Sequence, residues 1–296
     1  MSILVGIIGF GTVGNVLAKI FKNSGIQFGV YDVLFDNPAH KERLLKKAVE
    51  IDAPVMDLSE LCKQHTYIIS TVTTQVAGQV AKKTLPYLKS HHVYIDCNST
   101  SPGIKINIKD TILAGEAEFV EGVILNAVNP GDSTLSIITG GEKGDEVAVF
   151  FEKCGMKVRF YSEEVGKASM FKMLRSIFSK GVEVLLLEMM VAAKKAGIDQ
   201  DLWNEISSFM DSKPFKEIGE TWMRSHGTAY ERRMHEMEQV ITTMNELDVS
   251  PILTKATLQY FEQSKSFNLI SSFATPPSSA DEVVHQLAER VDEQKK

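Results

Sequence analysis

The feature that most constrains the fold is a glycine-rich turn near the start of the chain. The stretch "ILVGIIGFGTVGNVLAKIF" holds Gly9, Gly11 and Gly14 in the spacing G-x-G-x-x-G, after an apolar run and at the start of a helical pattern. In a strand–turn–helix unit, the first glycine permits the tight turn, the second lets the backbone approach a pyrophosphate, and the third lets the helix pack on the strand. The helix dipole and the exposed N–H groups of the turn, including Thr12 and Val13, favour the phosphates. The pattern predicts a dinucleotide-binding unit more strongly than a turn whose glycines serve only packing.

An acidic residue stands where the ribose of such a dinucleotide is expected. The next apolar run ends "GVYD", which places Asp32 18 residues after Gly14. A carboxylate there accepts hydrogen bonds from the ribose hydroxyls and repels a 2′-phosphate, so we expect NAD rather than NADP. Thr71, Val72 and Thr73 follow a later strand and are expected at the same edge of the sheet, as coenzyme contacts or only as a strand end with a helix cap.

The pattern of the chain changes near residue 162. Residues 1–162 alternate short apolar strands with helical patterns, which is typical of a parallel, doubly wound sheet of Rossmann type. Residues 163–296 show almost no strand pattern, so we expect an α/β domain followed by an all-helical domain. The expected strands are 2–9, 26–32, 65–71, 91–98, 117–125, 134–141 and 156–162. The expected helices are 12–24, 40–49, 74–84, 102–114, 144–154, 165–196, 199–211, 214–224, 228–247, 251–265 and 280–294.

Composition excludes several classes of function. The net charge is −6 and no dense Lys/Arg run occurs, which argues against nucleic-acid binding. No apolar run approaches the roughly 20 residues of a membrane span, and the apolar start lacks the basic region of a secretion signal. Cys62, Cys97 and Cys154 are far apart and have no metal-ligand spacing, so we expect reduced thiols, no bound metal and a cytoplasmic protein.

Two polar clusters interrupt apolar surroundings. Asn98, Ser99 and Ser101 follow the apolar run "YIDC", where neutral donors are expected to dock a small ligand, although Ser101 is equally suited to begin a helix. Lys172 lies in the nearly apolar helix "ASMFKMLRSIFSKGVEVLLLEM", and helical spacing places Arg175 and Ser176 on the same face. Burying an unpaired charge is unfavourable, so three explanations of Lys172 are open: it forms an ion pair, it is exposed to solvent, or it has a chemical role.

The order of these motifs resembles that of the β-hydroxyacid dehydrogenase superfamily, which includes 6-phosphogluconate and 3-hydroxyisobutyrate dehydrogenases. The stretches "HGTAYERRMHEMEQV" and "LDVSPILTKAT" also resemble the C-terminal helical domain of phosphogluconate dehydrogenase-like proteins. The resemblance spans nearly the whole chain. It implies a reversible, NAD(P)-linked oxidation of a small 3-hydroxy acid or β-hydroxy amino acid, with Lys172 as the catalytic lysine and Asn98 and Ser99 as the substrate pair. It also implies that the helical half forms a homodimer.

Two departures from the family pattern leave the substrate open. The family usually has Asn four residues after the lysine, and this chain has Ser176 there, preceded by Arg175. The family's Ser-Gly-Gly loop is replaced by "LNAVNPG" (125–131), which offers Asn126 as a substrate contact. Arg175 is suited to bind a substrate carboxylate or phosphate, or else to pair with Glu183 or another buried acid.

The mechanism expected from these residues is proton transfer by Lys172 during hydride transfer to the nicotinamide. Apolar surroundings and the nearby Arg175 should lower the pKa of Lys172, so that its neutral amine accepts the proton of the substrate hydroxyl. Asn98 and Ser99 would orient the substrate. Two other interpretations stay open: an imine reductase, although such enzymes often have Asp or Tyr at the Lys172 position, and a non-catalytic dinucleotide-binding redox sensor.

Overall fold

The computed structural model describes residues 4–294 and divides the chain into two compact units, Met1–Ile177 and Phe178–Lys296. The division falls inside α7 (Lys167–Ala196), so the first part of this helix belongs with the sheet. The change of sequence pattern at residue 162 coincides with the end of the last strand. No helix in the described part of the chain is long and apolar enough to cross a membrane.

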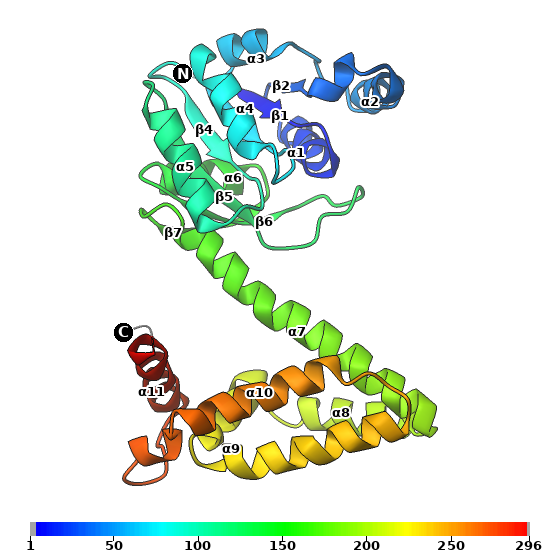
Figure 1. Ribbon diagram of the computed structural model, residues 1–296. Coiled ribbons are helices and arrows are strands. Elements are labelled where there is room, and N and C mark those ends of the chain that lie inside the picture. The colour runs from blue at the N-terminus through cyan, green and yellow to red at the C-terminus, as the bar shows by residue number, and fades with distance from the viewer. Residues whose placement is uncertain (1–3, 295–296) are drawn as a thin grey trace. The chain divides into compact units, whose positions relative to one another are not determined.

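The first unit is built on a seven-stranded sheet of order β2-β1-β3-β4-β5-β6-β7 (Figure 1). The strands are β1 (Val5–Ile8), β2 (Phe28–Tyr31), β3 (Tyr67–Ser70), β4 (Val93–Asp96), β5 (Glu118–Ile124), β6 (Ser136–Gly140) and β7 (Lys157–Ser162). The expected doubly wound α/β fold is confirmed, with one correction: β6 runs antiparallel to β5. No helix separates these two strands, and a parallel connection needs a crossover of a dozen or more residues.

Helices cover both faces of this sheet because both faces of its central strands are apolar. Neighbouring residues such as Ile7 and Ile8, or Ile68 and Ile69, point to opposite faces and enter two separate core clusters. One face carries α1 (Thr12–Asn23), α2 (Pro38–Glu50) and α6 (Gly144–Lys153). The other carries α3 (Leu58–Gln64), α4 (Ala77–Thr84) and α5 (Pro102–Leu113). The short helix α3 was not expected from the sequence.

The second unit is helical, as expected. After the C-terminal part of α7 come α8 (Asp199–Asp211), α9 (Phe215–Glu246), α10 (Ile252–Ser266) and α11 (Ala280–Glu293). The expectation of separate helices at 214–224 and 228–247 is wrong, because α9 runs through Gly227 without a break. A side chain at Gly227 would meet Pro277, Val283 and Phe273 within 3.1 Å, so this glycine serves close packing rather than a turn.

Candidate active site

The residues expected to form a site meet at the carboxyl edge of the sheet. The turns that follow β1, β3 and β4 lie at this edge because the three strands are parallel neighbours. A cavity of about 470 Å³ opens there, wholly within the first unit. The residues singled out from the sequence that line it are Val13, Thr71, Val72, Thr73, Asn98, Ser99, Asn126 and Lys172.

The glycine-rich turn has the geometry that its sequence predicts. Gly9 has φ +95°, and a Cβ on Gly14 would lie only 2.0 Å from the Gly9 carbonyl oxygen. The Thr71 hydroxyl donates a hydrogen bond to the same Gly9 oxygen at 2.7 Å, which holds the turn against the end of β3. A Cβ on Gly11, in contrast, would meet nothing within 4 Å. Gly11 therefore borders open space at the N-terminus of α1, where a phosphate can approach the backbone.

Asp32 joins the glycine-rich turn to the end of β2. Its Oδ2 accepts a hydrogen bond from the Phe10 backbone N–H at 2.7 Å, and its Oδ1 accepts one from the Leu34 N–H at 2.9 Å. A second cavity, of about 150 Å³, is lined by Gly9, Asp32 and Lys83 among others. Asp32 thus has a structural role that was not expected from the sequence, and it also borders this second cavity.

Asn98 is held rigidly after β4. Its backbone N–H donates to Asp96 Oδ1 at 3.0 Å, and its Nδ2 donates to Asp96 Oδ2 at 3.1 Å and to Ser70 Oγ at 3.0 Å. The Asn98 Oδ1 is buried and has no hydrogen-bond partner in the described part of the chain. Ser101 precedes α5, makes no side-chain capping hydrogen bond and does not line the cavity.

Lys172 reaches Ser99 across the cavity. Its Nζ donates a hydrogen bond to Ser99 Oγ at 2.7 Å. Burial is the main cause that lowers the pKa of Lys172, and the charge of Lys105 lowers it further. Cys97 opposes this shift, and Arg175 makes the smallest contribution, which lowers the pKa. The direction is the one expected from the sequence. The largest electrostatic effect, however, comes from Lys105, which was not expected from the sequence.

Arg175 and Ser176 lie beside this pair without lining the cavity. Arg175 Nη1 donates a hydrogen bond to the Leu125 carbonyl oxygen at 2.8 Å, at the start of the segment 125–131. Pairing of Arg175 with Glu183, one of the two alternatives, is not found: Glu183 accepts from Lys180 at 3.2 Å instead. The Ser176 hydroxyl donates to the Lys172 carbonyl oxygen at 2.9 Å, within the helix.

Three charged residues near this site were not expected from the sequence: Asp96, Lys105 and Glu121. All three side chains are fully buried. Each of them is the single charged residue in an apolar run, namely "YIDC", "GIKINI" and "FVEGV". Charged residues are almost never fully buried unless they are paired, so an isolated charge in such a run could have indicated a buried ion pair or a buried hydrogen-bond network. No group of residues suited to bind a metal ion occurs within residues 4–294.

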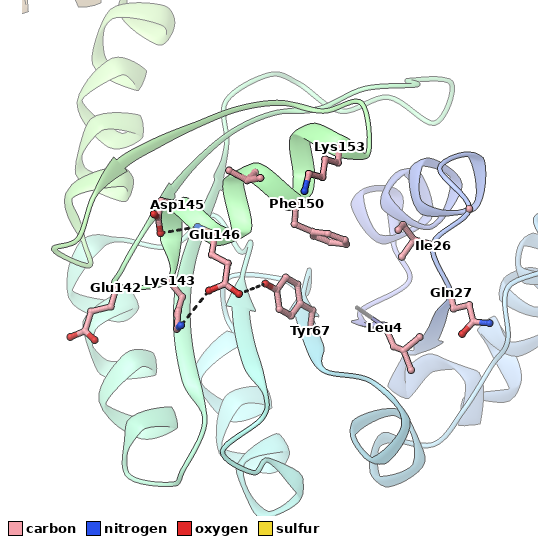
Figure 2. Close-up of a pocket in the computed structure, with 12 residues that line it drawn as sticks. Leu4, Ile26, Gln27, Tyr67, Glu142, Lys143, Asp145, Glu146, Phe150 and Lys153 are labelled. Carbon is pink, nitrogen blue, oxygen red and sulfur yellow. Dashed lines mark hydrogen bonds and ion pairs between the residues drawn. The ribbon is translucent and has the colours of Figure 1, made fainter. Parts of the chain in front are cut away.

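A larger cavity lies at the other edge of the sheet (Figure 2). It measures about 1110 Å³ and is bordered by the amino ends of β1, β2 and β3 and by α6. Figure 2 shows Glu146 between Lys143 and Tyr67, which donate to it at 3.2 and 3.4 Å. None of the residues expected to bind coenzyme or substrate lines this groove.

Comparison with known proteins supports the interpretation of both units. Residues 4–100 match the family model described as "NADP oxidoreductase coenzyme F420-dependent". Residues 193–264 match a domain of unknown function, DUF1932. A protein of Methanothermus fervidus, called an uncharacterized 28.5 kDa protein in the 7S RNA 5′ region, is 28% identical over 87% of this chain and 97% of its own length.

Solved structures share the fold over almost the whole chain. The conserved protein MTH1747, described as structurally similar to 3-hydroxyacid dehydrogenases, is 25% identical with a TM-score of 0.60, covering 89% of this chain and 97% of that one. An imine reductase from Myxococcus stipitatus in complex with NAD⁺ is 16% identical with a TM-score of 0.75, covering 97% and 100%. The chain therefore has the fold of NAD(P)-dependent oxidoreductases, similar to 3-hydroxyacid dehydrogenases and imine reductases, which confirms the resemblance expected from the motifs.

Proposed function

We propose that this chain, which has the fold of NAD(P)-dependent oxidoreductases, reversibly oxidises a small 3-hydroxy acid or β-hydroxy amino acid with NAD. The observation that carries the proposal is the Lys172 Nζ–Ser99 Oγ hydrogen bond of 2.7 Å, in a cavity that also reaches Val13 beside the glycine-rich turn. A lysine with a lowered pKa and a hydroxyl group stand together where the nicotinamide end of a coenzyme would lie.

The residues of the first unit fit a bound NAD. Gly9, Gly11 and Gly14 leave the N-terminus of α1 open to a pyrophosphate, with the N–H groups of Thr12 and Val13 in its first turn. Asp32 Oδ1 and Oδ2 each accept one backbone hydrogen bond and keep a second lone pair for a ribose hydroxyl. The negative charge of Asp32 would repel a 2′-phosphate, and on this ground we propose NAD rather than NADP.

The protein contributes proton transfer at Lys172 Nζ to this reaction. When bound, the nicotinamide ring supplies the acceptor for a hydride from the substrate carbon. The neutral Lys172 amine takes the hydroxyl proton in that direction, and the charged amine returns a proton in the reverse direction. Ser99 Oγ, which accepts from Lys172, keeps its own O–H to donate to the substrate. The buried Asn98 Oδ1, which precedes Ser99 by one residue, has no hydrogen-bond partner among the residues that the structure describes.

Arg175 gives the proposal its substrate class. Its Nη1 is engaged with the Leu125 carbonyl oxygen, and a guanidinium group has further N–H donors for a carboxylate. Arg175 lies three residues, about one helical turn, after Lys172. Of the residues expected to contact the substrate, Ser99 and Asn126 line the cavity, and we assign the inner contacts to them. Arg175, Ser176 and Ser101 lie outside the cavity lining, and we assign to them only contacts with a part of the substrate that extends beyond it.

The experiment that tests this function is an absorbance assay for NADH. The protein is incubated with NAD⁺ and a panel of 3-hydroxy acids, β-hydroxy amino acids and secondary amines. Turnover of a 3-hydroxy compound supports the proposal. Turnover of amines alone replaces it with imine reduction, and NAD⁺ binding by calorimetry without turnover of any compound replaces it with a non-catalytic redox sensor.

We also propose that the working form is a cytoplasmic homodimer. Within the second unit, α7 exposes apolar side chains, namely Val182, Val184, Leu185, Leu187 and Val191. An exposed apolar helix of this kind is typical of a subunit interface. The three cysteines are free thiols, as in reducing compartments. Sedimentation equilibrium tests the dimer, and a monomer at micromolar concentration would contradict it.

A further inference from the structure

Two buried acids lie side by side near the Lys172–Ser99 pair. Asp96 is the last residue of β4 and Glu121 lies in β5, and the two are register partners on neighbouring parallel strands. Both side chains are fully buried. A buried carboxylate is strongly unfavourable without partners, so the partners of these two reveal what the acids hold in place.

Asp96 holds the turn that carries Ser99. Its Oδ1 accepts from the Asn98 N–H at 3.0 Å and from Lys105 Nζ at 2.5 Å, and its Oδ2 accepts from Asn98 Nδ2 at 3.1 Å. Asn98 is therefore fixed by both its backbone and its side chain, directly before Ser99. Lys105, also fully buried, compensates the charge of Asp96.

Glu121 holds the helix that carries Lys172. Its Oε2 accepts from the Gly166 N–H at 2.8 Å, and its Oε1 accepts from the Ser169 N–H at 2.8 Å and from the Ser169 hydroxyl. N–H groups at a helix N-terminus lack partners within the helix, and the helix dipole favours a negative charge there. Because Ser169 and Lys172 are three residues apart on one face, this anchor fixes the rotation of the helix at Lys172.

We propose that Asp96 and Glu121 are paired positioning residues, which together set the distance between Lys172 Nζ and Ser99 Oγ. One acid fixes the hydroxyl partner and the other fixes the amine partner, and the sheet keeps the two acids in register. All four carboxylate oxygens accept hydrogen bonds from the protein, so the pair acts through Lys172 and Ser99 rather than on a ligand. This inference rests on the proposed role of Lys172 in proton transfer.

The test is Glu121→Gln in the full-length protein, with the pKa of Lys172 as the readout. A glutamine offers one acceptor oxygen and turns an amide NH₂ toward an N–H donor, which should release the first turn of α7. Lysines are dimethylated with ¹³C and titrated by NMR, and Lys172 is assigned by the signal missing in Lys172→Arg. We expect the Lys172 pKa to rise toward the ordinary lysine value, because the amine moves away from Lys105 and becomes more hydrated.

The matched control is Glu146→Gln on α6, whose carboxylate lies at the amino edge of the sheet and should leave the Lys172 pKa unchanged. Circular dichroism and the melting temperature report folding. If Glu121→Gln does not fold, Ser169→Ala removes one of the three donors to Glu121 and should give a smaller shift in the same direction. An unchanged Lys172 pKa in whichever variant folds overturns the role of Glu121.

The role of Asp96 is tested by Asn98→Ala, which removes the hydrogen bond from Asn98 Nδ2 to Asp96 Oδ2 and leaves the Lys105–Asp96 ion pair in place. We expect the Lys172 pKa to rise here also, because the Ser99 turn loosens and water reaches the amine while the charge of Lys105 stays. An unchanged Lys172 pKa overturns the role of Asp96 as a positioning residue. These titrations need no substrate, so a protein that shows the shifts but oxidises nothing in the NADH assay disproves the proposed function and leaves the positioning intact.

Discussion

The two edges of the sheet in the first unit differ in a way that cavity size does not reveal. The carboxyl edge has the smaller cavity, about 470 Å³ against about 1110 Å³, yet its polar side chains are tied to buried partners. At the amino edge the polar groups form solvent-exposed pairs, such as Lys143 with Glu146. Buried polar groups that converge on one cavity therefore indicate a candidate site better than the size of a solvent-exposed groove does.

The helix termini at the two edges explain part of this difference. At the carboxyl edge, α1 begins with no acidic residue in its first turn, which leaves its positive end available to an anion. At the amino edge, α6 begins with Asp145 and Glu146, which already satisfy its dipole. The antiparallel direction of β6 brings the start of α6 to that edge.

The largest expected effect is on turnover when Lys172 is changed. Lys172→Met removes the proposed proton-transfer group and should lower turnover by roughly a hundredfold to ten-thousandfold, which is the usual contribution of a general acid or base. NAD affinity, measured by calorimetry, should stay the same. Lys167→Met, on the same helix but in an exposed pair with Glu164, is the control and should be active. Near-normal turnover of Lys172→Met would contradict the proposal that proton transfer takes place at the carboxyl edge of the sheet.

Substitutions in the glycine-rich turn should distinguish effects on NAD binding from effects on the stability of the fold. A Cβ on Gly14 would lie 2.0 Å from the Gly9 oxygen, so Gly14→Ala should destabilise the fold by about 1–3 kcal/mol and abolish NAD binding. A Cβ on Gly11 meets only open space, so Gly11→Ala should keep the melting temperature and still weaken NAD binding. Thermal unfolding with calorimetry checks both, and unchanged NAD affinity in Gly11→Ala would contradict a pyrophosphate at this turn.

The pH dependence of turnover should follow the protonation of Lys172. Its pKa is lowered, chiefly by burial, and only the neutral amine accepts a proton. Oxidation should therefore speed up by about tenfold per pH unit below that pKa and level off above it. Reduction, which needs the charged amine, should slow as pH rises through the same value. Rate profiles in both directions that lack this opposite dependence would argue against Lys172 as the proton carrier.

A smaller effect is expected on coenzyme choice. Asp32→Asn keeps one acceptor oxygen but loses the charge, so NAD binding should weaken by roughly tenfold, as for a lost hydrogen bond to a charged group. NADP should gain relative to NAD, because the repulsion of a 2′-phosphate disappears while Lys83 still lines the same cavity. Calorimetry with each coenzyme measures the ratio, and an unchanged ratio would show that Asp32 serves only the backbone hydrogen bonds of the turn.

The sequence predicted the parts of this fold and site that depend on local pattern. The glycine spacing and the apolar strands each indicate one local structure, because neighbouring residues determine it. The antiparallel β6 and the continuous α9 depend on contacts between distant segments, and both expectations were wrong there. The partners of the buried acids were missed for the same reason, since Glu121 meets Ser169 48 residues away.

The smallest effects are expected at the amino edge, where Glu146→Gln provides the sharpest contrast. Burial, the charge of Glu146 and the hydrogen bond to Glu146 together raise the pKa of Tyr67 to about 12, and burial is the largest of these causes. Removing the charge should lower the Tyr67 pKa while leaving it above the ordinary tyrosine value, because burial is the larger cause. Absorbance of the phenolate measures this, and turnover and NAD affinity should not change. A loss of turnover or of NAD affinity in Glu146→Gln would show that the groove of Figure 2 takes part in the function, and would contradict a site confined to the carboxyl edge.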